Sequence, residues 1–146
     1  MRELPRQLTE GQLEELFEGP SPLTERLAGR DDPLEVAAEL ARELSDDEKV
    51  DALNAHPAIG AKGGLSERSR LEQGPDEDAA VETELAYLNQ VYEEKFGFRF
   101  VVFVAGRPKA RILDVLRERL ARTREEELET ALGELVAIAR DRWQRG

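Results

Sequence analysis

The chain lacks cysteine altogether, and it contains a single histidine and a single tryptophan. Without cysteine it can form no disulfide, no thiolate nucleophile and no cysteine-based zinc or iron–sulfur site. The longest apolar run, residues 100–105, is too short to span a bilayer. Residues 1–5 lack the apolar segment that is typical of a secretion signal. We therefore expect a cytoplasmic protein.

Negative charge dominates the residues that are present. Aspartate and glutamate number 32 against 21 lysines and arginines, which gives a formal net charge of −11. Clustered cations hold nucleic-acid phosphates and anionic membrane surfaces. We therefore expect no nucleic-acid partner and no membrane partner. A small anionic substrate remains compatible with this charge, because a pocket needs only one or two local cations.

The length of 146 residues is that of one ordinary domain. A domain of this size buries roughly 70% of the surface that its unfolded chain exposes, so it can form a real core. No linker, repeat or low-complexity tract interrupts the sequence. We expect a single domain over residues 1–146.

Helix-start signals recur along most of the chain. Hydroxyl side chains followed three positions later by Glu or Gln occur at Thr9, Ser45 and Thr123, as in capping boxes. Prolines open further helices, and apolar residues recur at helical spacing behind each signal. The predicted helices cover about residues 9–18, 21–28, 32–44, 45–54, 66–73, 77–96, 108–120 and 123–143. These patterns predict an all-α fold of seven or eight helices.

Residues 98–104 are strand-like by propensity alone. No second segment offers a strand for pairing, so we expect no sheet. This stretch is either a segment of the core or an irregular backbone that presents free N–H groups to a ligand.

Three further features could carry chemistry. His56 is the only side chain that titrates near neutral pH without perturbation, although it could equally lie on the surface at a helix end. Ser69, Glu72 and Gln73 share one face of a helix, which would also suit a solvated face. Arg142 could bind an anion or be one of many surface arginines.

The order and spacing of these features resemble one known family. Residues 54–60, Asn-Ala-His-Pro-Ala-Ile-Gly, resemble the "HP" loop of the 2-oxo-4-hydroxy-4-carboxy-5-ureidoimidazoline (OHCU) decarboxylases. Ser69-x-x-Glu72-Gln73 resembles that family's S-x-x-E-Q helix. The most specific string is Tyr-x-x-Lys-Phe-Gly-Phe-x-Phe-Val at residues 92–101. Residues 112–120 and 138–142 follow in the family's order, so the similarity covers roughly residues 13–143.

The resemblance implies an all-α, cofactor-free carboxy-lyase that converts an anionic ureidoimidazoline to (S)-allantoin in urate degradation. It also implies a homodimer. His56 and Glu72 would be catalytic, with His56 as the acid–base group and Glu72 holding the substrate and influencing the protonation of His56. Arg142 would clamp an anionic part of the substrate. The substrate-binding residues implied by the resemblance are Pro57, Ser69, Arg70, Leu71, Gln73, Phe100, Val101, Val102, Phe103, Val104 and Arg142.

Two alternatives remain open at this point. Residues 18–26 are shortened relative to the family's usual pattern, so a relative with the same fold could act on another ureido or imidazoline acid. The chain could instead be a non-catalytic, acidic helical module that binds a partner protein. In that case His56, Ser69, Glu72, Gln73 and Arg142 would be scattered over the surface.

Overall fold

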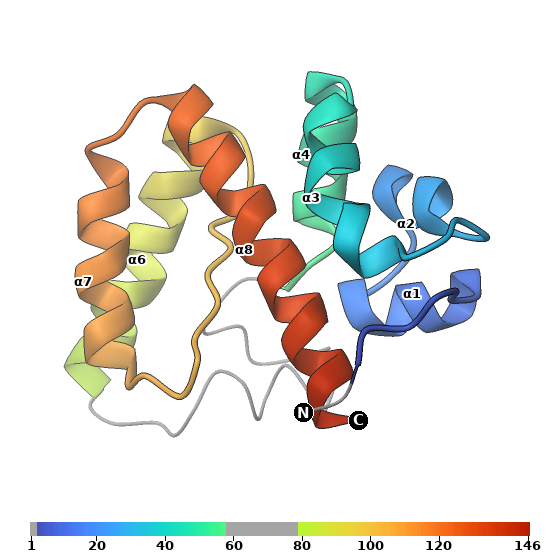
Figure 1. The fold of residues 1–146 in the computed structure, drawn as a ribbon. Coiled ribbons are helices and arrows are strands. Elements are labelled where there is room, and N and C mark those ends of the chain that lie inside the picture. The colour runs from blue at the N-terminus through green and yellow to red at the C-terminus, as the bar shows by residue number, and fades with distance from the viewer. Residues whose placement is uncertain (1–2, 58–78) are drawn as a thin grey trace.

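Helices form nearly all of the regular structure in this protein. The structure, a computed structural model, describes residues 3–57 and 79–146, and Figure 1 shows its fold. The helices of the described part are α1 (Glu10–Phe17), α2 (Pro22–Leu27), α3 (Pro33–Glu43), α4 (Asp46–Asn54), α6 (Ala79–Phe96), α7 (Lys109–Leu120) and α8 (Arg124–Arg145). The predicted all-α fold is confirmed. The predicted helix over residues 66–73 lies outside the described residues.

Local capping explains where several helices begin. Thr9, Ser45 and Thr123 each accept a hydrogen bond from the backbone N–H three residues later, and the Gln or Glu at that position bonds back to the cap. These reciprocal bonds satisfy N–H groups that have no partner within the helix. Ser21 and Thr24 form the same arrangement ahead of α2. The predicted helix starts are therefore confirmed at these positions.

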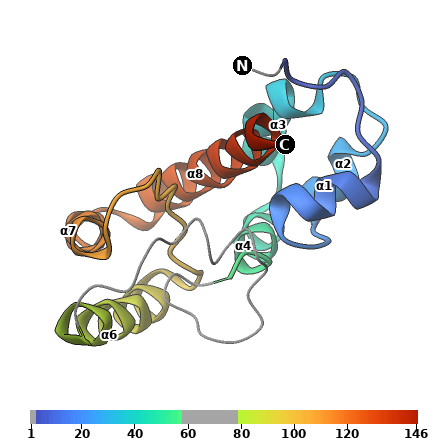
Figure 2. The same cartoon turned by 90° about the horizontal axis from the view of Figure 1, so that it is seen from below.

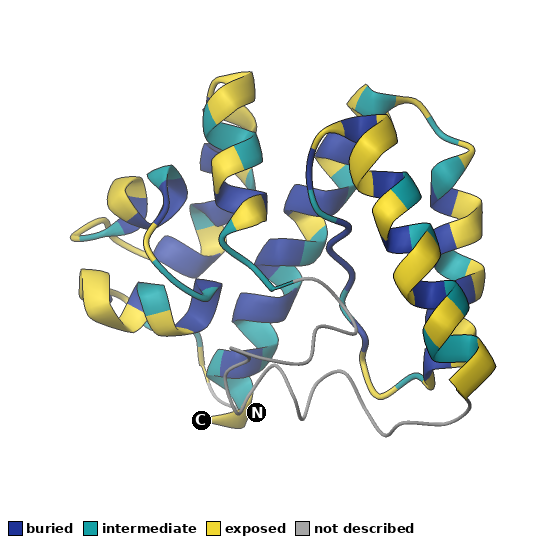
Figure 3. Cartoon of the chain, turned by 180° about the vertical axis from the view of Figure 1, so that it is seen from behind, coloured by how far each residue is buried: buried dark blue, intermediate teal, exposed yellow. Residues whose placement is uncertain are grey.

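Helix α8 is the central element of the fold. It runs between α6 and α7 on one side and α1 to α4 on the other (Figures 1 and 2). Its contacts with α1, α3 and α4 bury apolar side chains such as Leu132, Leu135 and Ala139. The helices around it place buried residues towards α8 and exposed residues outwards (Figure 3). One core therefore holds both ends of the chain together.

The segment from Phe98 to Val104 crosses this core as an extended, irregular strand-like stretch. No sheet occurs within residues 3–57 and 79–146, as expected from the lack of a pairing partner. Phe98, Phe100, Val101, Val102 and Val104 are all buried. Burial on both sides of the backbone accounts for the apolar, β-branched composition that resembled a strand.

Aromatic packing fixes the first half of this segment. Tyr92 of α6 lies 5.9 Å from Phe98 and 5.2 Å from Phe100, ring centre to ring centre, in edge-to-face arrangements. Phe96 completes the cluster at 4.6 Å from Tyr92. Such pairs add to the free energy of burial, so α6 and the segment behave as one packed unit.

No helix of the described residues is long and apolar enough to cross a membrane.

Candidate active site

His56 lies directly after the C-terminal end of α4. Its N–H donates to the carbonyl of Leu53, and Pro57 follows it, so the helix cannot continue. Arg99 fixes this turn from the extended segment. Its guanidinium donates to the carbonyls of Asn54 and His56, both at 2.9 Å, and its N–H donates to the Asn54 side chain. The backbone that carries the imidazole is therefore held by a residue 43 positions away.

The imidazole has a buried nitrogen that the described residues leave unsatisfied. His56 is half-buried, but its Nδ1 atom is shielded from solvent and has no hydrogen-bond partner among residues 3–57 and 79–146. A buried polar atom without a partner is unfavourable for stability. Such an atom is one that a bound ligand can satisfy.

The surroundings of His56 favour the neutral ring. Burial lowers the pKa of His56 to about 4, and the charge of Arg142 and that of Arg99 act in the same direction. The negative charge of Glu18 opposes them by raising that pKa. At neutral pH the imidazole of the free protein is therefore uncharged and able to accept a proton.

Arg142 is a buried arginine, not a surface one. Its side chain is 1% exposed, and it donates to the carbonyls of Leu16 at 3.0 Å and Glu15 at 3.5 Å. It also forms an ion pair with Glu18 at 3.2 Å. The C-terminal end of α8 is thereby bound to the C-terminal end of α1. The alternative that Arg142 belongs to the surface is wrong.

The extended segment contains backbone amides that are not used by the fold. No acceptor within the described part of the chain bonds to the N–H groups of Val101 or Val102. The N–H of Phe103 donates to Glu134 of α8 at 3.3 Å. Unpaired amides in a buried stretch are candidates for hydrogen bonds to a ligand.

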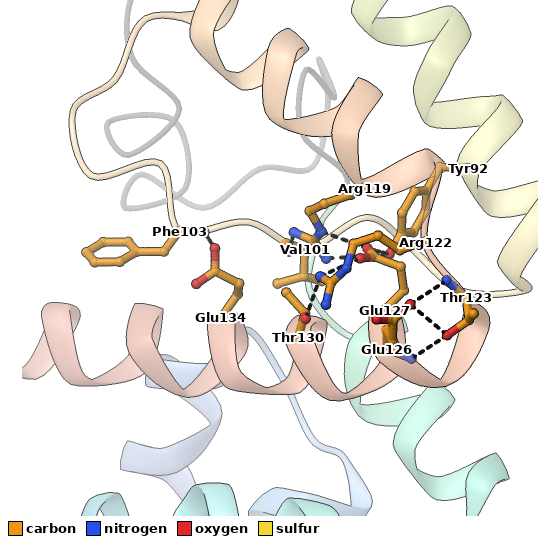
Figure 4. A network of polar contacts seen from close by, with 10 residues as sticks. All are labelled: Tyr92, Val101, Phe103, Arg119, Arg122, Thr123, Glu126, Glu127, Thr130 and Glu134. Atoms are coloured by element: carbon orange, nitrogen blue, oxygen red, sulfur yellow. Dashed lines mark hydrogen bonds and ion pairs between the residues drawn. The ribbon is translucent and has the colours of Figure 1, made fainter.

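A buried polar network of side chains from α6, α7 and α8 also holds the extended segment (Figure 4). Glu127 of α8 is fully buried and accepts hydrogen bonds from Tyr92, Arg119 and Arg122 at 2.6, 2.7 and 3.0 Å. Arg119 also donates to the carbonyl of Val101 at 2.8 Å, and its guanidinium lies over the Phe100 ring. Burial and the bond to Glu127 raise the pKa of Tyr92 well above its usual range. The network therefore fixes the carbonyl of Val101, whose N–H has no acceptor within the described residues.

The structure describes part of the predicted site. It places His56 and Arg142 so that the charge of the arginine acts on the imidazole. The predicted residues Ser69, Arg70, Leu71, Glu72 and Gln73 lie outside the described residues.

Two charged residues near His56 were not predicted as part of the site, namely Glu18 and Arg99. A signal for Glu18 was present in the sequence, because an acidic residue at a helix C-terminus is disfavoured by the helix dipole.

The fold and these residues together define a small all-α protein with a histidine beside an arginine–carboxylate ion pair. Comparison with known proteins gives the family. A family model described as OHCU decarboxylase matches residues 2–144. The chain belongs to the OHCU decarboxylase family.

Relatives and solved structures agree with this assignment. The chain is 36% identical over 110 residues to the "Uric acid degradation bifunctional protein" of Bacillus sp. (strain TB-90), covering 73% of this chain and 22% of that protein. It is 32% identical over 107 residues to the "2-oxo-4-hydroxy-4-carboxy-5-ureidoimidazoline decarboxylase" of Halalkalicoccus jeotgali, covering 70% of this chain and 60% of the relative.

A crystal structure of OHCU decarboxylase in the presence of (S)-allantoin has a TM-score of 0.73 and 25% identity to this protein. The match covers 90% of this chain and 94% of that one. The chain thus spans about a fifth of the length of the bifunctional Bacillus relative and three fifths of the Halalkalicoccus jeotgali one.

Proposed function

We propose that this protein is a carboxy-lyase that decarboxylates OHCU to (S)-allantoin in urate degradation, without a cofactor. Membership of the OHCU decarboxylase family supports the reaction. The observation that carries the proposal on this chain is the surroundings of His56. A neutral imidazole with an unsatisfied buried nitrogen lies within the influence of a buried arginine.

The chemistry requires little from a cofactor. Breaking the bond to the carboxylate releases CO₂ and leaves an electron pair on the ring carbon. The adjacent carbonyl–imine system of the substrate delocalises that pair, so the substrate is its own electron sink. The delocalised pair is protonated on the neighbouring ring carbon, which carries the ureido group, while the hydroxyl of the carbon that lost CO₂ gives up its proton and becomes a carbonyl. Delivery of the proton to one face of the ureido-bearing carbon gives (S)-allantoin and not a racemate.

His56 is suited to this proton transfer once the substrate is bound. In the free protein its ring is neutral, since burial and two arginines disfavour the charged form. An anionic substrate beside the ring offsets these effects and raises the pKa, so the imidazole can take up a proton and deliver it to the ureido-bearing carbon. The resting charge state and the acid–base role are therefore compatible.

The remaining roles follow the resemblance to the family. Arg142 interacts with an anionic group of the substrate, and the unused amides of Val101 and Val102 bind its polar edge. Glu72 acts with His56, while Ser69 and Gln73 bind the ureido or ring amides. Pro57, Arg70, Leu71, Phe100, Phe103 and Val104 complete the site. We further propose that the protein acts as a homodimer, which light scattering of the purified chain would test.

The alternative of a non-catalytic interaction module finds less support. That alternative places Arg142 on the surface, and its side chain is buried. A same-fold enzyme for a related ureido or imidazoline acid differs from the proposal in substrate only.

The test is optical. OHCU is generated in situ from urate, and the decay of its circular dichroism is followed with and without the protein. We expect the protein to accelerate the decay and to yield (S)-allantoin. A rate equal to the uncatalysed decay would refute the proposal, and turnover of a related ureido acid in its place would support the alternative substrate.

A further inference from the structure

Glu18 has a backbone conformation that is unfavourable for glutamate. It closes α1 in the left-handed region, with φ 65° and ψ 36°, and its N–H donates to the carbonyl of Glu14. Left-handed residues at helix ends are usually glycine, which has no Cβ to clash with the backbone. A glycine is present one position later, at Gly19, but it does not occupy the closing position. The strained position has a carboxylate where the backbone alone would favour glycine.

The charge of Glu18 is also unfavourable for the helix. The C-terminal end of a helix carries a partial negative charge, which favours cations and repels a carboxylate. Asp and Asn occur in left-handed positions more often than Glu does. Strain retained at one residue is a reason to look for a function of its side chain.

The carboxylate of Glu18 contacts the buried arginine. Its Oε1 lies 3.2 Å from Nη2 of Arg142, with the two side chains 15% and 1% exposed. The other terminal nitrogen, Nη1, donates to the carbonyls of Leu16 and Glu15. The guanidinium is therefore oriented both by backbone carbonyls at the end of α1 and by the carboxylate of Glu18. Of these groups, only the carboxylate carries a charge.

We propose that Glu18 is a positioning residue, which fixes the guanidinium of Arg142 beside His56 and sets the net charge there. The inference rests on the proposed function, because it assigns Glu18 to the same site. The charges of Glu18 and Arg142 act on the imidazole in opposite directions, which supports their common location. Among the described residues, Glu18 is the negative charge that opposes Arg142 and Arg99 at His56.

Two substitutions of Glu18 separate the effect of the position of its carboxylate from the effect of its charge. Glu18→Asp keeps the charge, suits the left-handed backbone better and withdraws the carboxylate by one methylene. Glu18→Gln keeps the length and removes the charge. The matched control is Asp32→Glu, because Asp32 is also left-handed, with φ 49°, and no side-chain capping bond depends on it.

We expect Glu18→Asp to unfold within a few degrees of the wild type but to lose between about tenfold and 10²-fold in kcat, as for a displaced orienting group. KM should rise by less than kcat falls, because the arginine that binds the anion is displaced but retained. Glu18→Gln should lose at least as much kcat, and Asp32→Glu should lose none. Wild-type kcat in Glu18→Asp would overturn the proposal and leave Glu18 as a charge that serves only the fold.

A second readout does not depend on turnover. His56 is the only histidine, so the imidazole ¹H–¹⁵N signals of the protein report this residue alone. We expect Glu18→Asp to shift these signals at neutral pH and Asp32→Glu to leave them in place. If the wild type fails to decarboxylate OHCU, the proposed function is refuted. Shifted signals would then still support the role of Glu18 at His56, and unmoved signals would overturn it.

Discussion

At the scale of single residues, the protonation state of His56 depends on neighbours from three separate parts of the chain. Glu18 follows α1, Arg99 belongs to the extended segment and Arg142 lies near the end of α8, and all three act on the pKa of the imidazole. Burial is the main cause of the neutral ring in the free protein, and the two arginines add to it while Glu18 opposes them. The role of His56 in catalysis and its effect on the pH dependence of stability can be tested separately.

The first prediction concerns catalysis. His56→Asn should lower kcat by at least about 10²-fold, the usual effect of losing a positioned acid–base group. Thermal stability at neutral pH should change little, because the imidazole Nδ1 makes no hydrogen bond to the described residues that could be lost. The product should drift towards racemic allantoin as the uncatalysed route takes over. Production of (S)-allantoin at the wild-type rate would exclude His56 as the proton donor.

The second prediction concerns stability against pH. The pKa of His56 is about 4 in the folded protein, against an ordinary value of 6.5. As the pH falls, the unfolded chain therefore binds the proton first, and the folded state loses stability. From about pH 7 to pH 5 the loss due to His56 should be about 1–2 kcal/mol, measured by urea unfolding.

His56→Asn should abolish this part of the pH dependence. The carboxyl groups with lowered pKa values in the described part of the chain, Asp46, Glu48 and Glu126, lose their contribution only near and below their ordinary values of 3.8 to 4.5. They therefore do not account for a change between pH 7 and 5. Identical pH dependence in the variant and the wild type would contradict the lowered pKa.

At the scale of elements, the extended segment is held by two kinds of interaction, aromatic packing and hydrogen bonding to a buried arginine. Aromatic rings of α6 pack against Phe98 and Phe100, and Arg119 of α7 binds the carbonyl of Val101. Arg119 is itself bound by Glu127 of α8 at 2.7 Å. The irregular backbone therefore keeps a defined shape without the hydrogen bonds of a sheet.

The third prediction tests the buried ion pair between α7 and α8. Glu127→Gln removes the charge that faces Arg119, and both side chains are almost fully buried. An uncompensated buried guanidinium is strongly unfavourable, so the free energy of unfolding should fall by about 3 kcal/mol. Asp114→Asn is the control, because its pair with Arg117 is exposed and should be worth less than about 1 kcal/mol. Equal losses in the two variants, measured with urea, would show that burial does not decide the effect.

At the scale of the whole molecule, the charge near the site differs from the charge of the chain. The protein carries a net charge of −11, yet among the residues that the structure describes two arginines act on His56 against one glutamate. A local excess of positive charge in an acidic protein favours a small anion at that place over a large polyanion anywhere on the surface. This distribution agrees with the anionic substrate of the proposed reaction.

The fourth prediction concerns metal ions. Decarboxylation should survive exhaustive treatment with EDTA and should need no added cofactor. The reasons are the electron sink in the substrate, the absence of cysteine and the presence of one histidine. The measurement is the decay of the OHCU circular dichroism before and after chelation. Activity that is lost on chelation and returns with one particular metal would refute this expectation.

The sequence alone determined where several of the described helices begin, and it predicted the residues of the proposed site. Capping boxes at Thr9, Ser45 and Thr123 formed as predicted, because their hydrogen bonds join residues three positions apart and depend on no other part of the fold. His56 and Arg142 were also predicted as site residues, since a single histidine and an arginine in the family's order can be found by inspection.

The tertiary structure decided what surrounds those residues. The bond from Arg142 to Leu16 joins positions 126 residues apart, and the ion pair with Glu18 depends on the same packing of α8 against α1. The lowered pKa of His56 arises from burial and from the charges of Arg142 and Arg99, and Glu18 opposes it. Such effects depend on distances through space, and distances between remote residues are set only when the helices pack around one core.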